Sequence, residues 1–300
     1  MSGLSILTLV RNRELHLRQL VEGLRRSERS PDELIVVDMS DTPVSIGPTS
    51  FPVRVDRFET DGLPLAEARN RAAALARYPS LVFLDVDCIP LAHCLARLDD
   101  ELRRCDGLLC ADIRYLGPDD ARGPWVEQDL LAAGERHAAR RFPDRGVRRE
   151  TNSGLFWSLA FAIRAGTFAR LEGFDAGFTG YGAEDTDFGF RAEAAGLPLL
   201  FVGGAIACHQ HHDSHDPPVQ HLAAIVANAR RFRARWGRWP MEGWLASFQA
   251  MGLVRWTSDA LTLLRMPTPG EIEATSVARS GGSAPPSGED RPALPGVVVA

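Results

Sequence analysis

The sequence predicts an α/β protein built on a doubly wound sheet. Strand-like apolar runs at 4–10, 34–38 and 81–85 alternate with helix-like segments at about 14–27 and 65–77. This alternation is typical of βαβ units in a parallel sheet. With 300 residues, 45% of them hydrophobic and 24% charged, the chain is long enough for one large domain and an appendage.

The third strand-like run ends in two carboxylates. Asp85 and Asp87 follow directly after the apolar residues 81–84. In open α/β sheets ligands bind outside the carboxyl ends of the strands, and paired acids there suit a divalent cation that carries a phosphorylated ligand. The structural alternative is that Asp85 caps the following turn and Asp87 caps a helix from about Leu91. Other features of the chain therefore have to decide.

Composition excludes several classes of protein. The net charge of -5 and pI near 5.9 argue against a nucleic-acid-binding protein. Five cysteines without Cys-x-x-Cys spacing indicate neither a disulfide framework nor a zinc ribbon, which favours a reducing cytoplasm. The chain starts without a basic leader and has no apolar stretch near ~20 residues, so we expect it to be neither exported by that route nor transmembrane. Neither Gly-x-Gly-x-x-Gly after the first strand nor a Walker-type loop is present.

The second half of the chain is less regular. Apolar runs at 107–113, 155–163 and 199–207 could extend the sheet, while 117–150 reads as a long excursion of the kind that often forms a mobile lid.

A helical pattern covers Val219 to about Leu264, where arginines stand among aromatic residues. We expect a solvated face beside aromatic core contacts, with a membrane-surface or acceptor-binding role as the alternative. The arginines are Arg230, Arg231, Arg233, Arg235 and Arg238. Residues 268–300 are rich in Pro, Gly and Ser, and we expect them to be disordered.

A second acidic cluster lies in 180–191. Small residues there precede Glu184, Asp185 and Asp187, which we expect to begin a helix, where acids are favoured electrostatically. One interpretation is that Asp185 or Asp187 only caps this helix. The preceding glycine and aromatic loop, 173–178, favours a catalytic role because such a loop is costly to order unless it closes over something.

Histidines follow the strand-like residues 199–206. Four lie between 209 and 215, and they could be a solvated turn or contain a metal ligand. With the Asp pair, one imidazole would complete a mixed oxygen and nitrogen site that suits Mn²⁺, with Mg²⁺ next. His209, nearest the strand, is the preferred candidate.

Together these elements resemble a known family. The chain is similar to family 2 glycosyltransferases of the GT-A fold, in the subgroup whose C-terminal catalytic half resembles β-1,4-galactosyltransferases and bacterial chondroitin polymerases. The resemblance covers roughly residues 3–215, with the motifs in family order. It implies a Rossmann-like mixed sheet flanked by helices in 1–215, followed by a helical extension at 216–267 and the tail at 268–300.

The resemblance implies roles for the donor-binding residues. Thr8, Arg13 and Asp38 would hold the nucleotide base, although Asp38 begins Asp-Met-Ser-Asp where the family usually has Asp-Asp-x-Ser. Arg69, in Ala-Arg-Asn, would pair with the diphosphate. Asp85 would approach the ribose or a metal-bound water.

The same resemblance implies the metal ligands and the catalytic acids. Asp87 and His209 would ligate the metal. Asp185 would be the general base and Glu184 would bind hydroxyls, in a Gly-Ala-Glu-Asp segment where Ala183 replaces a family glycine. Trp157 and Tyr181 could stack on sugar rings or simply pack in the core.

The function expected is metal-dependent, inverting hexosyl transfer from a nucleoside diphosphate sugar, with UDP as the family donor, to a saccharide, lipid-linked or small-molecule acceptor. We expect no nucleic-acid partner and a cytoplasmic location. Peripheral contact with the inner face of the membrane, through residues 230–244, is a further option. The alternatives are a non-catalytic sugar-nucleotide or glycan-binding protein of the same fold, and a haloacid dehalogenase-type phosphatase, which Ile89 at the fifth motif position disfavours.

Overall fold

A computed structural model describes residues 3–277 of the chain. Its main feature is a ten-stranded mixed sheet with the order β3-β2-β1-β4-β9-β6-β10-β5, to which β7 adds at β6 and β8 at β10. The strands are β1 Leu4–Val10, β2 Glu33–Asp38, β3 Val53–Arg57, β4 Ser80–Leu84, β5 Cys88–Pro90, β6 Leu108–Tyr115, β7 Glu135–Arg136, β8 Val147–Glu150, β9 Ala160–Arg164 and β10 Leu199–His209. The helices packed around it are α1 Glu14–Arg26, α2 Leu65–Leu75, α3 Cys94–Arg104, α4 Glu127–Ala133, α5 Ala165–Arg170 and α6 Glu184–Ala194.

The N-terminal half of the sheet is parallel, as the βαβ pattern predicts. β1 pairs in parallel with both β2 and β4, and β2 pairs in parallel with β3. The sheet becomes mixed where β9 inserts antiparallel between β4 and β6. The three parallel strands β1, β2 and β4 therefore end at one edge, and that edge carries the acidic residues.

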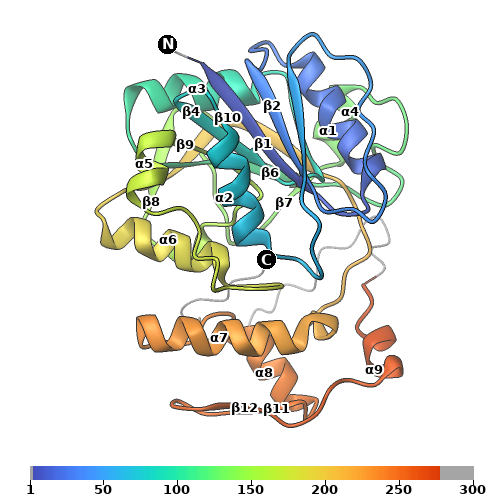
Figure 1. Ribbon diagram of the computed structural model, residues 1–300, viewed down its shortest axis with the longest axis vertical. Coiled ribbons are helices and arrows are strands. Elements are labelled where there is room, and N and C mark those ends of the chain that lie inside the picture. The colour runs from blue at the N-terminus through green and yellow to red at the C-terminus, as the bar shows by residue number, and fades with distance from the viewer. Residues whose placement is uncertain (1–2, 278–300) are drawn as a thin grey trace.

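Alternation of apolar side chains along β1 explains why helices cover both faces. Ile6 points to a core that includes α1 and α3, whereas Leu7 points to a core that includes α2, α5 and α6. Both residues are almost fully buried, as a strand enclosed on both faces requires. Figure 1 shows these helices on either side of the strands.

The segment after the Asp pair differs from the expectation. The chain forms β5, antiparallel to β10, before α3 begins at Cys94, and no described side chain caps α3. The N-cap position of α3 is His93, six residues after Asp87. The capping interpretation of Asp87 is therefore wrong. The excursion at 117–150 is also more structured than expected, because it contains α4, β7 and β8.

The C-terminal part is not one continuous helical pattern. It contains α7 Leu222–Trp236 and α8 Glu242–Ala250, followed by a hairpin of β11 Val254–Trp256 and β12 Leu261–Leu263. Gly237, with φ of 69°, ends α7 in the left-handed conformation that glycine favours. These elements share a separate apolar core and lie beyond α6 from the sheet in Figure 1.

The expectation of disorder from residue 268 onward is wrong for residues 268–277, which the structure describes. Pro269–Ala274 form α9, whose first turn is closed by a capping box between Thr268 and Glu271. Residues 278–300, the rest of the expected tail, lie outside the described residues.

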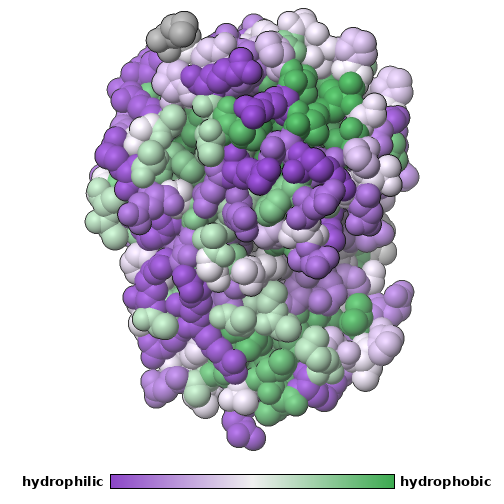
Figure 2. Space-filling model, viewed as in Figure 1, coloured by the Kyte–Doolittle hydropathy of each residue, from purple (hydrophilic) through white to green (hydrophobic). Residues whose placement is uncertain are grey.

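The arginines of α7 are largely engaged within the protein. Arg231 and Arg235 bond Asp175, Arg233 lies 3.4 Å from Asp259, and Arg230 donates to the Leu261 carbonyl. The visible face in Figure 2 mixes hydrophilic and hydrophobic residues over this region. Within residues 3–277, no helix has the length and apolar character needed to cross a bilayer.

Candidate active site

Asp87 is the centre of the site at the sheet edge. The pairing of β10 with β5 puts His209 opposite Cys88, and the Gln210 amide donates to the Asp87 carbonyl at 2.7 Å. The His209 Nε2 atom lies 3.5 Å from Asp87 Oδ1, and His212 Nε2 lies 3.5 Å from Oδ2. One ligand atom from each of these three residues lies within 4.8 Å of the others.

A guanidinium also contacts the same carboxylate. Arg13, in the loop after β1, donates to Asp87 Oδ2 at 2.6 Å. Burial disfavours the charged form of Asp87, but His209, Arg13 and His212 outweigh it and hold the pKa of this carboxyl below its usual value. Asp87 is therefore an ionised, buried carboxylate facing cationic and imidazole groups.

Asp85 belongs to a second, adjoining cluster. Arg69 of α2, 4% exposed, lies 3.3 Å from Asp85 Oδ1 and donates to Glu184 Oε1 at 3.0 Å. Burial raises the pKa of Asp85 to about 6, with Arg69 opposing the shift and Asp87 adding to it. The guanidinium expected to pair with a diphosphate thus pairs with two carboxylates in this structure.

Glu184 and Asp185 begin α6. The residue before them, Ala183, has φ of 72°, the left-handed conformation in which the family's glycine at this position carries no steric cost. Asp185 is 7% exposed, and burial together with the Glu184 charge raises the pKa of Asp185 to about 7. A carboxyl with that pKa can accept a proton near neutral pH. No described side chain caps α6, so the capping interpretation is not observed.

Asp187 has a different role from its two neighbours. It is fully buried and accepts hydrogen bonds from Arg191, Arg235 and the Trp236 indole. The third acid of the cluster is therefore a structural link between α6 and α7.

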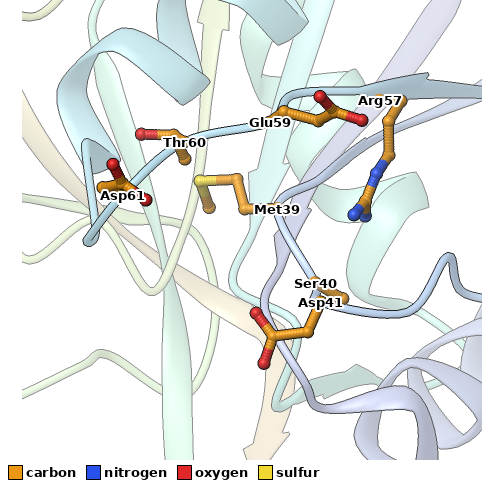
Figure 3. A pocket seen from close by; sticks show the side chains of 7 residues that line it. All are labelled: Met39, Ser40, Asp41, Arg57, Glu59, Thr60 and Asp61. Carbon is orange, nitrogen blue, oxygen red and sulfur yellow. The ribbon is translucent and has the colours of Figure 1, made fainter.

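A pocket of about 380 Å³ opens beside the ends of β2 and β3 (Figure 3). Its lining residues are Met39, Ser40, Asp41, Arg57, Glu59, Thr60 and Asp61. Asn12 exchanges two hydrogen bonds with Asp41, and its neighbour Arg13 bonds Asp87, so the loop after β1 links the pocket to the Asp87 cluster.

Neither Thr8 nor Asp38 lines this pocket. Thr8 is buried in β1, and Asp38 is fully buried and accepts from the backbone amides of Ser40 and Val44. Arg57 Nη1 lies 3.1 Å from Asp38. The carboxylate expected to contact the base instead fixes the pocket loop and Arg57.

The two aromatic residues considered for sugar stacking are packed. Trp157 is 1% exposed, with its ring against His137 and Arg140. Tyr181 stacks on His221, with ring centroids 4.6 Å apart. Core packing, the alternative stated for both, describes them better.

The structure adds His212 and Arg57 to the residues expected from sequence. His212 was one of four histidines after the strand, and nothing in the spacing separates it from His211 or His215. Arg57 ends β3, an edge strand that the apolar runs of the sequence do not predict. Only the folded loops bring these side chains to the site.

Comparison with known proteins identifies the family. Residues 5–176 match the model of glycosyl transferase family 2, and residues 142–215 match one described as the N-terminal domain of galactosyltransferase. The first match covers more than half of the chain. The chain therefore belongs to glycosyl transferase family 2, as the sequence motifs predict.

Two curated relatives carry the same name. Validoxylamine A glucosyltransferase of Streptomyces hygroscopicus subsp. limoneus is 28% identical over 261 residues, covering 76% of this chain and 56% of the relative. The protein of that name from Streptomyces hygroscopicus subsp. jinggangensis (strain 5008) is 33% identical over 201 residues, covering 58% and 46%. The chain thus spans about half the length of these relatives.

A solved structure agrees on the fold. GalNAc-T7 with UDP, GalNAc and Mn²⁺ aligns with a TM-score of 0.54 and 19% identity, over 70% of this chain and 43% of that one. The mixed sheet described above is a GT-A fold.

Replacing Arg69 by methionine tests the electrostatics of the cluster. Without the guanidinium, Asp85 and Glu184 are left unpaired, and removing one partner of a buried ion pair costs about 3–5 kcal/mol. Because the folded-state pKa of Asp85 is already raised, the ionised form is destabilising, and this destabilisation grows as pH rises through about 6. We expect Arg69→Met to lower the free energy of unfolding more at pH 8 than at pH 5, measured by urea denaturation.

The matched control is Arg71→Met on the same helix. Arg71 bonds Asp56 at the surface with 43% of its side chain exposed, so its loss should cost at most about 1 kcal/mol. An equal loss at both pH values for Arg69→Met, or one no larger than the control shows, would contradict the electrostatic account.

Proposed function

We propose that this protein is a metal-dependent, inverting glycosyltransferase that moves a sugar from a nucleoside diphosphate donor to an acceptor hydroxyl. The observation that carries the proposal is the juxtaposition, at one sheet edge, of the Asp87 and histidine cluster with the cluster of Asp85, Arg69, Glu184 and Asp185. The first offers a cation site and the second a carboxylate that can take a proton. Sugar transfer to a hydroxyl requires both functions.

The donor set at Asp87 fits a divalent transition-metal cation. One carboxylate and two imidazole nitrogens suit Mn²⁺ better than they suit Mg²⁺ or Ca²⁺, because those two ions prefer sites made only of oxygen ligands. Asp87, His209 and His212 would hold the ion. When bound, it would neutralise the charge that develops on a departing nucleoside diphosphate.

The nucleoside would occupy the pocket at the ends of β2 and β3. Ser40, Arg57 and Thr60 offer hydrogen-bonding groups there, and Asp38 keeps the first two in place through the contacts described above. Arg13 contacts Asp87 and directly follows Asn12, which bonds the pocket residue Asp41, and its guanidinium can pair with phosphate oxygens. A uridine donor is proposed, because the similar structure of GalNAc-T7 contains UDP.

Asp185 would be the general base. It is buried, its pKa is near neutral, and it lies beside Glu184, which is left to bind acceptor or donor hydroxyls. Attack by the deprotonated hydroxyl from the face opposite the leaving diphosphate would invert the anomeric centre. The relatives' names point to a glucosyl donor and to validoxylamine A as the acceptor, which we adopt as the first pair to test.

Histidine substitutions test the cation site. His209→Ala and His212→Ala should each weaken Mn²⁺ binding by about tenfold or more, because each removes a direct ligand. His211→Ala is the control, since His211 is not part of the cluster among the described residues. Isothermal titration with Mn²⁺ alone measures the affinities. Unchanged affinity for His212→Ala would reduce the proposed ligand set to Asp87 and His209.

Removing the carboxylate of Asp185 tests the base. Asp185→Asn should lower kcat at least about 100-fold, the lower end of general-base contributions, while UDP and Mn²⁺ affinity stays within about twofold. The assay uses UDP-glucose and validoxylamine A. Because the raised pKa makes ionised Asp185 destabilising above pH 7, the variant should unfold no more easily than the wild type at pH 8.

Asp100→Asn, at an exposed position of α3, serves as the control and should keep wild-type turnover. Normal turnover of Asp185→Asn would remove Asp185 from the role of base.

A further inference from the structure

The loop before the two acids is held from outside the sheet domain. Asn228, on α7 and 2% exposed, uses its side-chain amide to donate to the carbonyls of Thr179, Tyr181 and Gly182, at 3.0, 3.2 and 2.9 Å. Its Oδ1 accepts from the Thr179 amide at 3.3 Å. One buried side chain thus fixes the backbone that leads directly into Glu184.

The same helix contacts α6 two turns further on. Arg235, seven residues after Asn228 and so on the same face of α7, donates to Asp187 at 2.8 Å and to Asp175 at 2.7 Å. The indole of Trp236 donates to Asp187 at 2.9 Å. Asp187 is two residues from Asp185, within the first turn of α6.

Glycines make the close approach possible. A methyl group built at Gly180 would lie 2.7 Å from the Ala224 Cβ of α7, and one built at Gly182 would lie 3.0 Å from the Met241 sulfur. Both glycines have positive φ, 72° and 94°. The loop is therefore clamped between α7 and the sheet domain, with little freedom to take another course.

We propose that α7 is a positioning element for sugar transfer, with Asn228 as its principal residue, because it sets the position of Glu184 and Asp185 through the 179–182 loop and Asp187. This inference rests on the proposed function of Asp185, and it assigns to the C-terminal segment a part in the chemistry. Asn228 contacts no reacting group, so it acts through the backbone it holds. A displacement of a catalytic group by about 1 Å can cost about 100-fold in rate.

Two substitutions at one position separate positioning from bulk stability. Asn228→Ala removes all four hydrogen bonds, while Asn228→Asp keeps the shape but turns an oxygen toward three carbonyls. The control is Arg230→Ala, on the same helix but exposed and bonded to the Leu261 carbonyl. For both Asn228 variants we expect kcat for UDP-glucose and validoxylamine A to fall about 10- to 100-fold, with UDP affinity in Mn²⁺ within about threefold of wild type.

Hydrogen exchange gives a readout independent of turnover. Amides in 178–186 should exchange at least about tenfold faster in Asn228→Ala than in Arg230→Ala, while those of β1 and β4 stay protected. If the wild type transfers no sugar to this acceptor, the proposed function fails for this pair, and the exchange data still decide whether Asn228 holds the loop.

Several results would overturn the inference. The first is a kcat within twofold of wild type in both Asn228 variants. The second is a loss of UDP affinity in these variants as large as their loss of turnover. The third is faster hydrogen exchange in Asn228→Ala that spreads over the whole chain. If Asn228→Ala does not fold, Trp236→Phe, which removes only the indole hydrogen bond to Asp187, is judged by the same criteria.

Discussion

The structure depends on the gathering of four carboxylates, three of them buried, at one edge of the sheet. Asp87, Glu184 and Asp185 are buried, Asp85 beside them keeps 29% of its side chain exposed, and an unpaired buried charge costs several kcal/mol. Arg69 balances one group of acids, and Arg13 with two imidazoles balances Asp87. A globular protein would avoid such a concentration of charge unless the site needed it. The charged and imidazole groups that offset this cost come from the loop after β1, from α2, from the end of β10 and from the loop after β10.

This balance also explains why the site draws on distant parts of the chain. The Asp pair follows β4, but its partners come from the loop after β1 and from the end of β10, which the sheet order brings to the same edge. The second group of acids comes from α6, which is held against α7 by Asp187. The helical segment after residue 215 therefore contacts the loop before the proposed catalytic acids and Asp187 beside them, although most of its apolar residues form a core of their own.

Much of the fold and part of the site could be predicted from the sequence. Apolar runs with abrupt acidic or histidine endings identify strand exits, and this is why Asp85, Asp87 and His209 are found together as expected. The role of Asp38 could not be read in this way, since an acid after a strand can face a ligand or, as here, hold its own loop. Asn228 is one uncharged polar residue in a helical pattern that also carries arginines, and only tertiary packing gives it partners. The α7 to β12 region was expected to be helical throughout because helical and strand periods are hard to separate in short apolar runs such as Val254–Trp256.

The measurement that tests the central claim most directly is a thermal-shift titration with UDP, GDP and CMP, each with and without Mn²⁺, on the wild type and on Asp87→Ala. A ligand that binds only the folded state raises its Tm, by about 5 °C at one hundred times Kd for a chain of this size. A metal-and-nucleotide site at Asp87 predicts a rise with UDP that requires Mn²⁺ and is lost in Asp87→Ala. No rise with any nucleotide, or a rise that needs no metal and persists in Asp87→Ala, would contradict it.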